Sequence, residues 1–152
     1  MNQTRELSVV KKIRCTFFLF CIGGALYNII EIIWRGYTHW SMFIVGGICF
    51  NLIGRIHTMC KKGWIIRCTL CSLVITVIEF LSGCIFNLRL NMNVWNYSGM
   101  LLNIKGQVCL LYSLLWGALS ILARPIYRVC IRHLVGDHVS LPKPAVLQRA
   151  GR

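Results

Sequence analysis

The chain has 152 residues, of which 57% are hydrophobic and only 14% are charged. A soluble domain usually has about a quarter charged residues, so this composition excludes an ordinary soluble domain. The formal net charge of +13 would suggest nucleic acid as the partner of a soluble protein. Here, however, the basic residues mostly border apolar stretches, where they fix topology and meet anionic lipid headgroups. We therefore expect a membrane protein whose partner is the lipid bilayer and not nucleic acid.

The first predicted membrane helix covers residues 13–33 and follows a short N-terminal segment, residues 1–12. Lys11 and Lys12 precede the apolar run, and Trp34 and Arg35 follow it. At 1.5 Å per residue the run crosses a hydrocarbon layer of about 30 Å. A cleaved signal peptide also has a basic start, but its apolar core is shorter. We therefore expect a retained transmembrane helix.

The second and third predicted helices cover residues 40–56 and 64–86. The second run is the shorter one and carries Asn51 and Arg55 near its end, so its boundary is less sharply defined. The third run is long and uninterrupted. Both are expected to span the membrane.

The fourth predicted helix covers residues 104–123. It is expected to end at Arg124 and Pro125, because proline cannot continue a helix cleanly. This end closes a transmembrane domain at residues 13–124.

Residues 125–135 are too few to span a membrane. Apolar residues at helical spacing lie opposite Arg128 and Arg132, which predicts a basic amphipathic helix on the membrane surface. Residues 136–152 contain Pro142 and Pro144 and little apolar content, which is typical of a flexible tail. The predicted fold class is therefore all-α: a polytopic four-transmembrane-helix bundle with a short C-terminal interfacial helix.

The distribution of Lys and Arg predicts the orientation. Residues 1–14 hold four, residues 55–67 hold four and residues 124–152 hold six, whereas the other two loops hold only three, Arg35, Arg89 and Lys105. Cytoplasmic loops carry the excess of basic residues. Both termini are therefore expected in the cytoplasm.

The two carboxylates within the predicted helices need partners, because a charge at depth costs about 2.5 to 3.5 kcal/mol on insertion scales. Glu79 lies about 22 Å from the start of its helix, in the outer third, and Glu31 lies near the outer end of its own helix. Arg35 follows Glu31 at the spacing of a local ion pair. These residues and their polar neighbours at the same level form a predicted polar cluster: Glu31, Arg35, Glu79, Asn87, Arg89, Asn103 and Gln107.

Two interpretations of this polar cluster remain open. In one, Glu79 is paired or protonated and locks the bundle together. In the other, the cluster lines an outward-facing cavity that binds a polar ligand, a cation or a proton.

The loop of residues 87–103 is predicted to form an outer cap. Trp95, Asn96 and Tyr97 lie at its centre, and the aromatic rings suit the headgroup level. The loop is also dense in asparagine, which predicts a folded cap held by hydrogen bonds from side chains to the backbone.

No catalytic or metal site is evident. The nine cysteines lie mainly inside apolar runs at irregular spacing, so we interpret them as packing residues. Cys68 and Cys71 form a CxxC without a second pair, which is a weak zinc or redox signal. The four histidines form no HxxxH or HExxH spacing. We expect no cofactor and no enzymatic activity.

Two blocks of residues resemble a known family. The first block contains Tyr27, Asn28, Glu31, Trp34, Arg35 and Gly36, followed by the run from Thr38 to Met42 with Gly46 and Gly47. The second block contains Glu79, Phe80, Gly83 and Asn87, then Val94 to Ser98, then Asn103, Gly106 to Leu110 and Trp116. Together they resemble the bacterial membrane family called putative ABC-transporter type IV. The second block is similar to that family's E, WDYS and N-x-x-G-Q/R-I-C-L pattern, except that Asn96 stands where the family usually has Asp.

The resemblance implies a permease-like component of an ABC-type transport system in the bacterial cytoplasmic (inner) membrane. The chain contains no G-x-x-x-x-G-K-[ST] loop, so an ATPase would be a separate subunit. Four helices are few for a translocation path, which implies a homo-oligomer. The alternative is a non-transporting scaffold or assembly partner.

Overall fold

The computed structural model describes the backbone of residues 2–135 and the side chains of residues 9–134. Within this range the chain is all-helical and contains no strand. The elements are α1 (Asn2–Arg35), α2 (Trp40–Met59), α3 (Trp64–Gly83), the π-helical η1 (Cys84–Arg89) and α4 (Leu110–Val135). The predicted tail at residues 136–152 lies outside the described residues.

Four segments of the described chain are long and apolar enough to cross a membrane: Val9–Arg35, Trp40–Met59, Trp64–Arg89 and Leu110–Leu134. They agree with the predicted number of spans. The first three agree with the predicted ranges to within a few residues, apart from the helical extension of α1 toward the N-terminus. Four spans of this kind are those of a multi-pass membrane protein.

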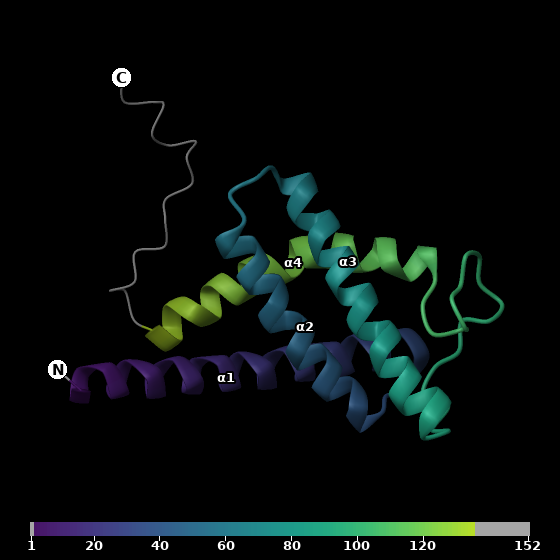
Figure 1. Cartoon of the computed structure of the whole chain (residues 1–152), viewed down its shortest axis with the longest axis horizontal. Coiled ribbons are helices and arrows are strands. Elements are labelled where there is room, and N and C mark those ends of the chain that lie inside the picture. Colours follow the sequence, from purple (N-terminus) through teal and green to yellow (C-terminus); the bar gives the residue numbers. More distant parts are fainter. Residues whose placement is uncertain (1, 136–152) are drawn as a thin grey trace.

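The helices pack mainly as two pairs. α1 lies along α2 and α3 lies along α4, while α2 also contacts α3 and α4; the contact between α1 and α4 is the smallest of these interfaces. In Figure 1, α2 and α3 cross between the longer α1 and α4, and the C-terminal part of α4 descends toward the N-terminal half of α1. Large apolar side chains cover much of the outer surface of the bundle, as lipid contact requires.

Glycines allow α1 and α2 to approach closely. A Cβ atom added to Gly23 would collide with Phe50, and one added to Gly46 would collide with Tyr27. Small residues serve this purpose in membrane bundles, where helices associate by close packing. Gly23 and Gly46 are therefore packing residues of the α1–α2 interface.

The predicted start of the fourth helix is wrong. Residues 104–109 form a tight turn in which Ile104 and Val108 pair as an isolated β-bridge. Lys105 and Gly106 have φ angles of 51° and 67°, in the left-handed region that a helix cannot contain. α4 therefore begins at Leu110.

The predicted end of that helix at Ala123 is also wrong, and residues 125–135 do not form a separate amphipathic helix. α4 continues through Pro125 to Val135, with a visible bend (Figure 1). A membrane helix tolerates proline when neighbouring groups satisfy the freed backbone. Tyr127 holds the continued helix, because its ring packs over Gly54 and against Phe50 in the bundle.

Candidate functional site

The predicted ion pair between Glu31 and Arg35 is present. The Arg35 Nη2 lies 2.6 Å from the Glu31 Oε1, and Thr38 donates a hydrogen bond of 2.8 Å to the other carboxylate oxygen. Arg35 also donates from Nη1 to the backbone oxygen of Val94 at 3.1 Å. Arg35 therefore joins the end of α1 to the loop of residues 90–109, here called the cap loop.

Glu79 has neutral partners. Its Oε1 accepts a hydrogen bond of 3.0 Å from the Tyr97 hydroxyl, and its Oε2 accepts one of 2.9 Å from the Trp116 indole. The Glu79 side chain is only 5% exposed. The two donors come from the cap loop and from α4, so this carboxylate connects three separate parts of the chain.

Arg89 does not join the cluster. It is exposed, and no hydrogen bond or ion pair forms between Arg89 and the other described side chains. We expected Arg89 to lie beside Glu79 because the sequence places both residues at the same depth in the membrane. The π-helical turn η1 carries Arg89 at its last position, which changes the register at which side chains leave the helix.

Asn87 and Gln107 form the base of the cap loop. The Asn87 Nδ2 donates to the Gln107 Oε1 at 2.8 Å and to the Trp95 backbone oxygen at 2.9 Å. The Asn87 Oδ1 accepts from the Val94 N–H at 2.7 Å. Trp95 in turn donates from its indole to the Gln107 backbone oxygen at 2.8 Å. These buried groups are fully engaged with one another, so they position the cap and leave no atom for a ligand.

Asn103 and Asn96 hold turns within the cap loop. Asn103 donates to the backbone oxygens of Ser98 and Met100 and accepts from the Gly106 N–H. Asn96 accepts from the Ser98 N–H at 2.9 Å and from the Ser98 hydroxyl at 2.6 Å. The prediction of a cap held by side-chain to backbone hydrogen bonds is confirmed by these contacts.

Backbone conformation explains two further asparagines of the cap loop. Asn91 and Asn93 have φ angles of 52° and 47°. Asparagine is among the few residues with a side chain that adopt this region readily. The asparagine content therefore has two causes, hydrogen bonding and left-handed turns.

Tyr97 is another residue that connects the cap loop to the bundle. Its ring stacks on Tyr112 with 4.6 Å between centroids, and its hydroxyl reaches Glu79. Burial raises the pKa of the Tyr97 phenol, and the Glu79 carboxylate raises it further. The phenol therefore stays protonated and remains a donor.

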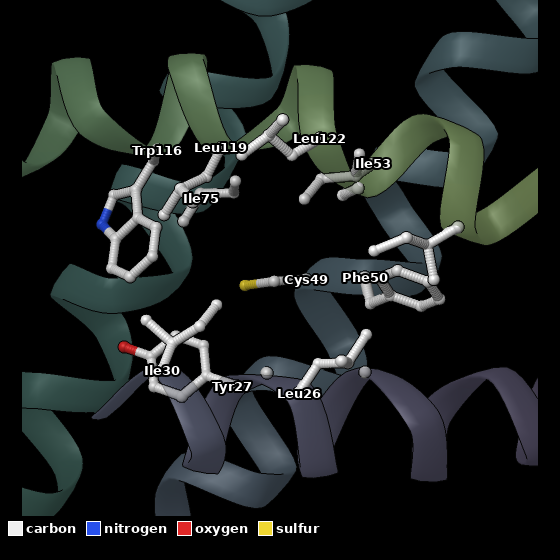
Figure 2. Close-up of a pocket in the computed structure, with 14 residues that line it drawn as sticks. Leu26, Tyr27, Ile30, Cys49, Phe50, Ile53, Ile75, Trp116, Leu119 and Leu122 are labelled. Atoms are coloured by element: carbon white, nitrogen blue, oxygen red, sulfur yellow. The ribbon is translucent and has the colours of Figure 1, made fainter. Parts of the chain in front are cut away.

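Two adjoining cavities lie between α1 and α4. The first has a volume of about 320 Å³ and an almost entirely apolar lining drawn from all four helices. Figure 2 shows Tyr27 and Leu26 of α1 on one side, Trp116 and Leu119 of α4 on the other, and Cys49 of α2 between them.

The second cavity, of about 250 Å³, continues the first toward the cap loop. The two cavities share four lining residues, Tyr27, Ile30, Trp116 and Leu119. The second cavity adds polar side chains, which include Glu31, Arg35, Tyr97 and Tyr112. Its lining does not include Glu79. The two cavities, here called the α1–α4 groove, thus combine an apolar middle with one polar end.

The predicted polar cluster is therefore divided. Glu31 and Arg35 line the groove, whereas Glu79 is hydrogen-bonded to the cap loop and to α4. Asn87, Asn103 and Gln107 make the hydrogen bonds that hold the cap loop. Tyr112 and Trp34 were missed, although the Trp34 indole donates to the Tyr112 hydroxyl at 3.2 Å and both line the groove. Nothing in their local sequence spacing indicates that contact, because they are far apart in the chain.

Among the described side chains, no group of three or more His, Cys, Asp or Glu residues lies together as a metal site. The nine cysteines are all free thiols.

A comparison with protein families gives one match over most of the chain. The model of the family described as Putative ABC-transporter type IV matches residues 15–144. No curated protein and no solved structure matches.

Proposed function

Because the chain belongs to the Putative ABC-transporter type IV family, we propose that it is a permease-like membrane subunit of an ABC-type transport system. The α1–α4 groove is the observation that carries this proposal. In it an apolar volume lined by all four helices adjoins the Glu31–Arg35 ion pair.

The lining of the groove favours an amphiphilic solute. Apolar side chains surround the larger volume, and the Glu31–Arg35 pair stands at the end nearer the cap loop. Binding sites commonly combine apolar walls with a few polar groups that orient the ligand. A solute with an apolar body and a polar end matches this division.

The energy source of such a system would be a separate polypeptide. The chain contains no phosphate-binding G-x-x-x-x-G-K-[ST] loop. A complete path would also need more than four helices, and self-association across the exposed apolar faces would supply them. We place the protein in the bacterial cytoplasmic membrane with both termini and the basic α2–α3 turn, residues 60–63, in the cytoplasm. It would contain no catalytic residues of its own.

Copurification tests the partner, and a pair of tryptophan variants tests the groove. Crosslinking in the native membrane followed by purification should yield an ATP-binding subunit. Leu119→Trp fills the groove, whereas Leu114→Trp adds the same ring to a position of α4 that is 63% exposed. Solute-stimulated ATP hydrolysis by the purified complex should fall with Leu119→Trp and stay unchanged with Leu114→Trp. A protein that crosslinks only to itself, or equal activity in both variants, would contradict the permease proposal.

A second candidate is a non-transporting scaffold, and the environment of Glu79 favours it. Both oxygens of that carboxylate are engaged by neutral donors, and it lies outside the lining of the groove. This is the arrangement of a structural lock. A scaffold predicts that Leu119→Trp and Glu79→Gln leave every flux unchanged while partner binding persists.

A further inference from the structure

Basic side chains from three helices converge at the end of the bundle that lies away from the cap loop. His57 of α2 is nearly completely buried, with 6% of its surface exposed. The charges that act on its ring come from Arg67 of α3 and from Arg124 and Arg128 of α4. Arg124 also lies within the fields of Arg67 and Arg128. Arginines of two helices therefore lie around the histidine of a third.

Several nitrogens of this basic cluster have no partner. Both ring nitrogens of His57 and the Nε atoms of Arg67 and Arg124 are buried without a hydrogen bond. The Ser120 backbone acts on the His57 ring, but the contact lacks hydrogen-bond geometry. Buried polar atoms are nearly always hydrogen-bonded in folded proteins. Unpartnered nitrogens from three helices in one place indicate a missing acceptor.

No carboxylate among the described side chains compensates this charge. The acids of residues 9–134 are Glu31 and Glu79. Glu79 stands twelve residues beyond Arg67 on α3, which is about 18 Å along the helix axis. Both acids are already engaged near the cap loop. The basic cluster therefore carries an uncompensated positive charge within the described part of the chain.

We propose that His57, Arg67 and Arg124 form a binding site for a phosphate-type oxyanion. A guanidinium group presents a planar fork of donors that matches phosphate oxygens, and such charge-assisted bonds are the strong ones. The ring of His57, which comes from a third helix, adds a further donor. The phosphate comes either from the headgroup of an anionic lipid or from a free phosphate in solution.

Membrane orientation alone does not require this arrangement. Lys61 and Lys62 in the α2–α3 turn are exposed, and exposed basic residues of that kind are sufficient for the positive-inside bias. Arg67 and Arg124 are half-buried, and their Nε atoms lack an acceptor, as do the ring nitrogens of the buried His57. The positive-inside bias does not require this arrangement, whereas an anion would supply the missing acceptors and offset the repulsion between the arginines. The site lies at membrane-surface level, because Arg67 is in the first turn of α3.

The test uses the full chain in maltoside micelles, which contain no phosphate. Phosphatidylglycerol and inorganic phosphate are titrated separately, and binding is followed by the rise in the midpoint of thermal unfolding. Arg67→Gln and Arg124→Gln should each weaken binding about tenfold or more, since a hydrogen bond to a charged group is lost. Lys62→Gln removes the same charge from an exposed neighbour and should leave the affinity unchanged. A response to phosphatidylglycerol alone identifies the lipid as the source, and a response to inorganic phosphate identifies a free anion.

Two results would overturn the proposal: a rise that Lys62→Gln reduces as much as Arg124→Gln does, or no rise with either phosphate. If Arg124→Gln does not fold, Arg124→Lys keeps the charge, loses the planar fork and should still weaken binding. The readout is anion binding and not flux. Its failure would leave the permease proposal standing, and the reverse also holds.

Discussion

The side chains of Asn87 and Gln107 meet in a hydrogen bond of 2.8 Å that joins the π-helical end of α3 to the turn preceding α4. Gly83 makes this contact possible, because a Cβ atom there would lie 2.5 Å from the Gln107 Oε1. The cap loop is thus fastened where it leaves one helix and where it enters the next. Neutral amides hold this base of the cap loop, and the charged Arg35 and Glu79 hold it at Val94 and Tyr97.

Replacing Asn87 by Asp should detach the cap loop, whereas replacing Asn96 by Asp should not. Asn87 donates two hydrogen bonds through its amide nitrogen, and a carboxylate would instead face the two acceptor oxygens, at a cost of about 2 to 3 kcal/mol. Asn96 only accepts hydrogen bonds, so Asp can take its place. Hydrogen exchange of residues 90–109 is the measurement. Equal protection in the two variants would show that the amide of Asn87 does not hold the loop.

Substituting Glu79 by Gln should leave the protein folded but less stable by about 1 to 3 kcal/mol. Gln keeps one oxygen to accept from the Trp116 indole, and its amide has to donate to the Tyr97 hydroxyl. Both contacts then lack the strength of a hydrogen bond to a carboxylate. Unfolding in mixed micelles with the single variants and the double variant Glu79→Gln/Trp116→Phe measures the coupling. A double variant whose loss equals the sum of the single losses would mean that the two side chains do not interact.

The stabilising effect of Tyr97 should decrease at high pH. The pKa of its phenol is higher in the folded protein than the unfolded value of about 10. Folding therefore favours the protonated phenol, and its contribution is complete below that unfolded value and declines as the pH rises above it. The difference in unfolding free energy between the wild type and Tyr97→Phe should be constant near neutral pH and shrink above about pH 10. A constant difference at all pH values would contradict the buried hydrogen bond.

Gly46→Leu should separate α1 from α2. Even a Cβ atom at this position collides with Tyr27, and overpacking of this kind costs about 1 to 3 kcal/mol or more. Gly99→Leu is the matched control, since an added Cβ atom there meets nothing within 4 Å. Thermal unfolding of the two variants in detergent compares them. Similar midpoints would show that the two helices can move apart freely.

Lysine accessibility should reveal the orientation without any substitution. Lys61, Lys62 and Lys105 are exposed at opposite ends of the bundle. A membrane-impermeant amine reagent applied to intact cells should modify Lys105, and should modify Lys61 and Lys62 only after the membrane is opened. Peptide mass spectrometry detects each site. The opposite pattern would reverse the positive-inside assignment.

Local sequence patterns predicted the spans and the contacts between close neighbours. Long apolar runs are specified by the thickness of the bilayer, and the Glu31–Arg35 pair follows from helical spacing alone. The asparagine content of the cap loop was interpretable for the same reason, because its hydrogen bonds connect residues a few positions apart.

Contacts between residues far apart in the sequence could not be predicted from local patterns. Glu79 reaches Trp116 across 37 positions, and no spacing rule indicates which indole faces which carboxylate. The course of α4 through Pro125 likewise depends on Tyr127 packing over Gly54. Proline lacks the backbone N–H that continues a helix, so the sequence predicts that the helix ends there. The packing of Tyr127 over Gly54 holds the helix together instead.

The contrast between the two ends of the bundle has a consequence for ionic strength. Salt screens repulsion among the converging basic groups around His57, and it does so least where those groups are buried. Neutral amide hydrogen bonds such as Asn87 to Gln107 are nearly insensitive to it. A change in salt or in anionic lipid therefore acts more strongly on the basic end of the bundle than on the amide-held base of the cap loop, so the two ends of the molecule respond unequally to ions.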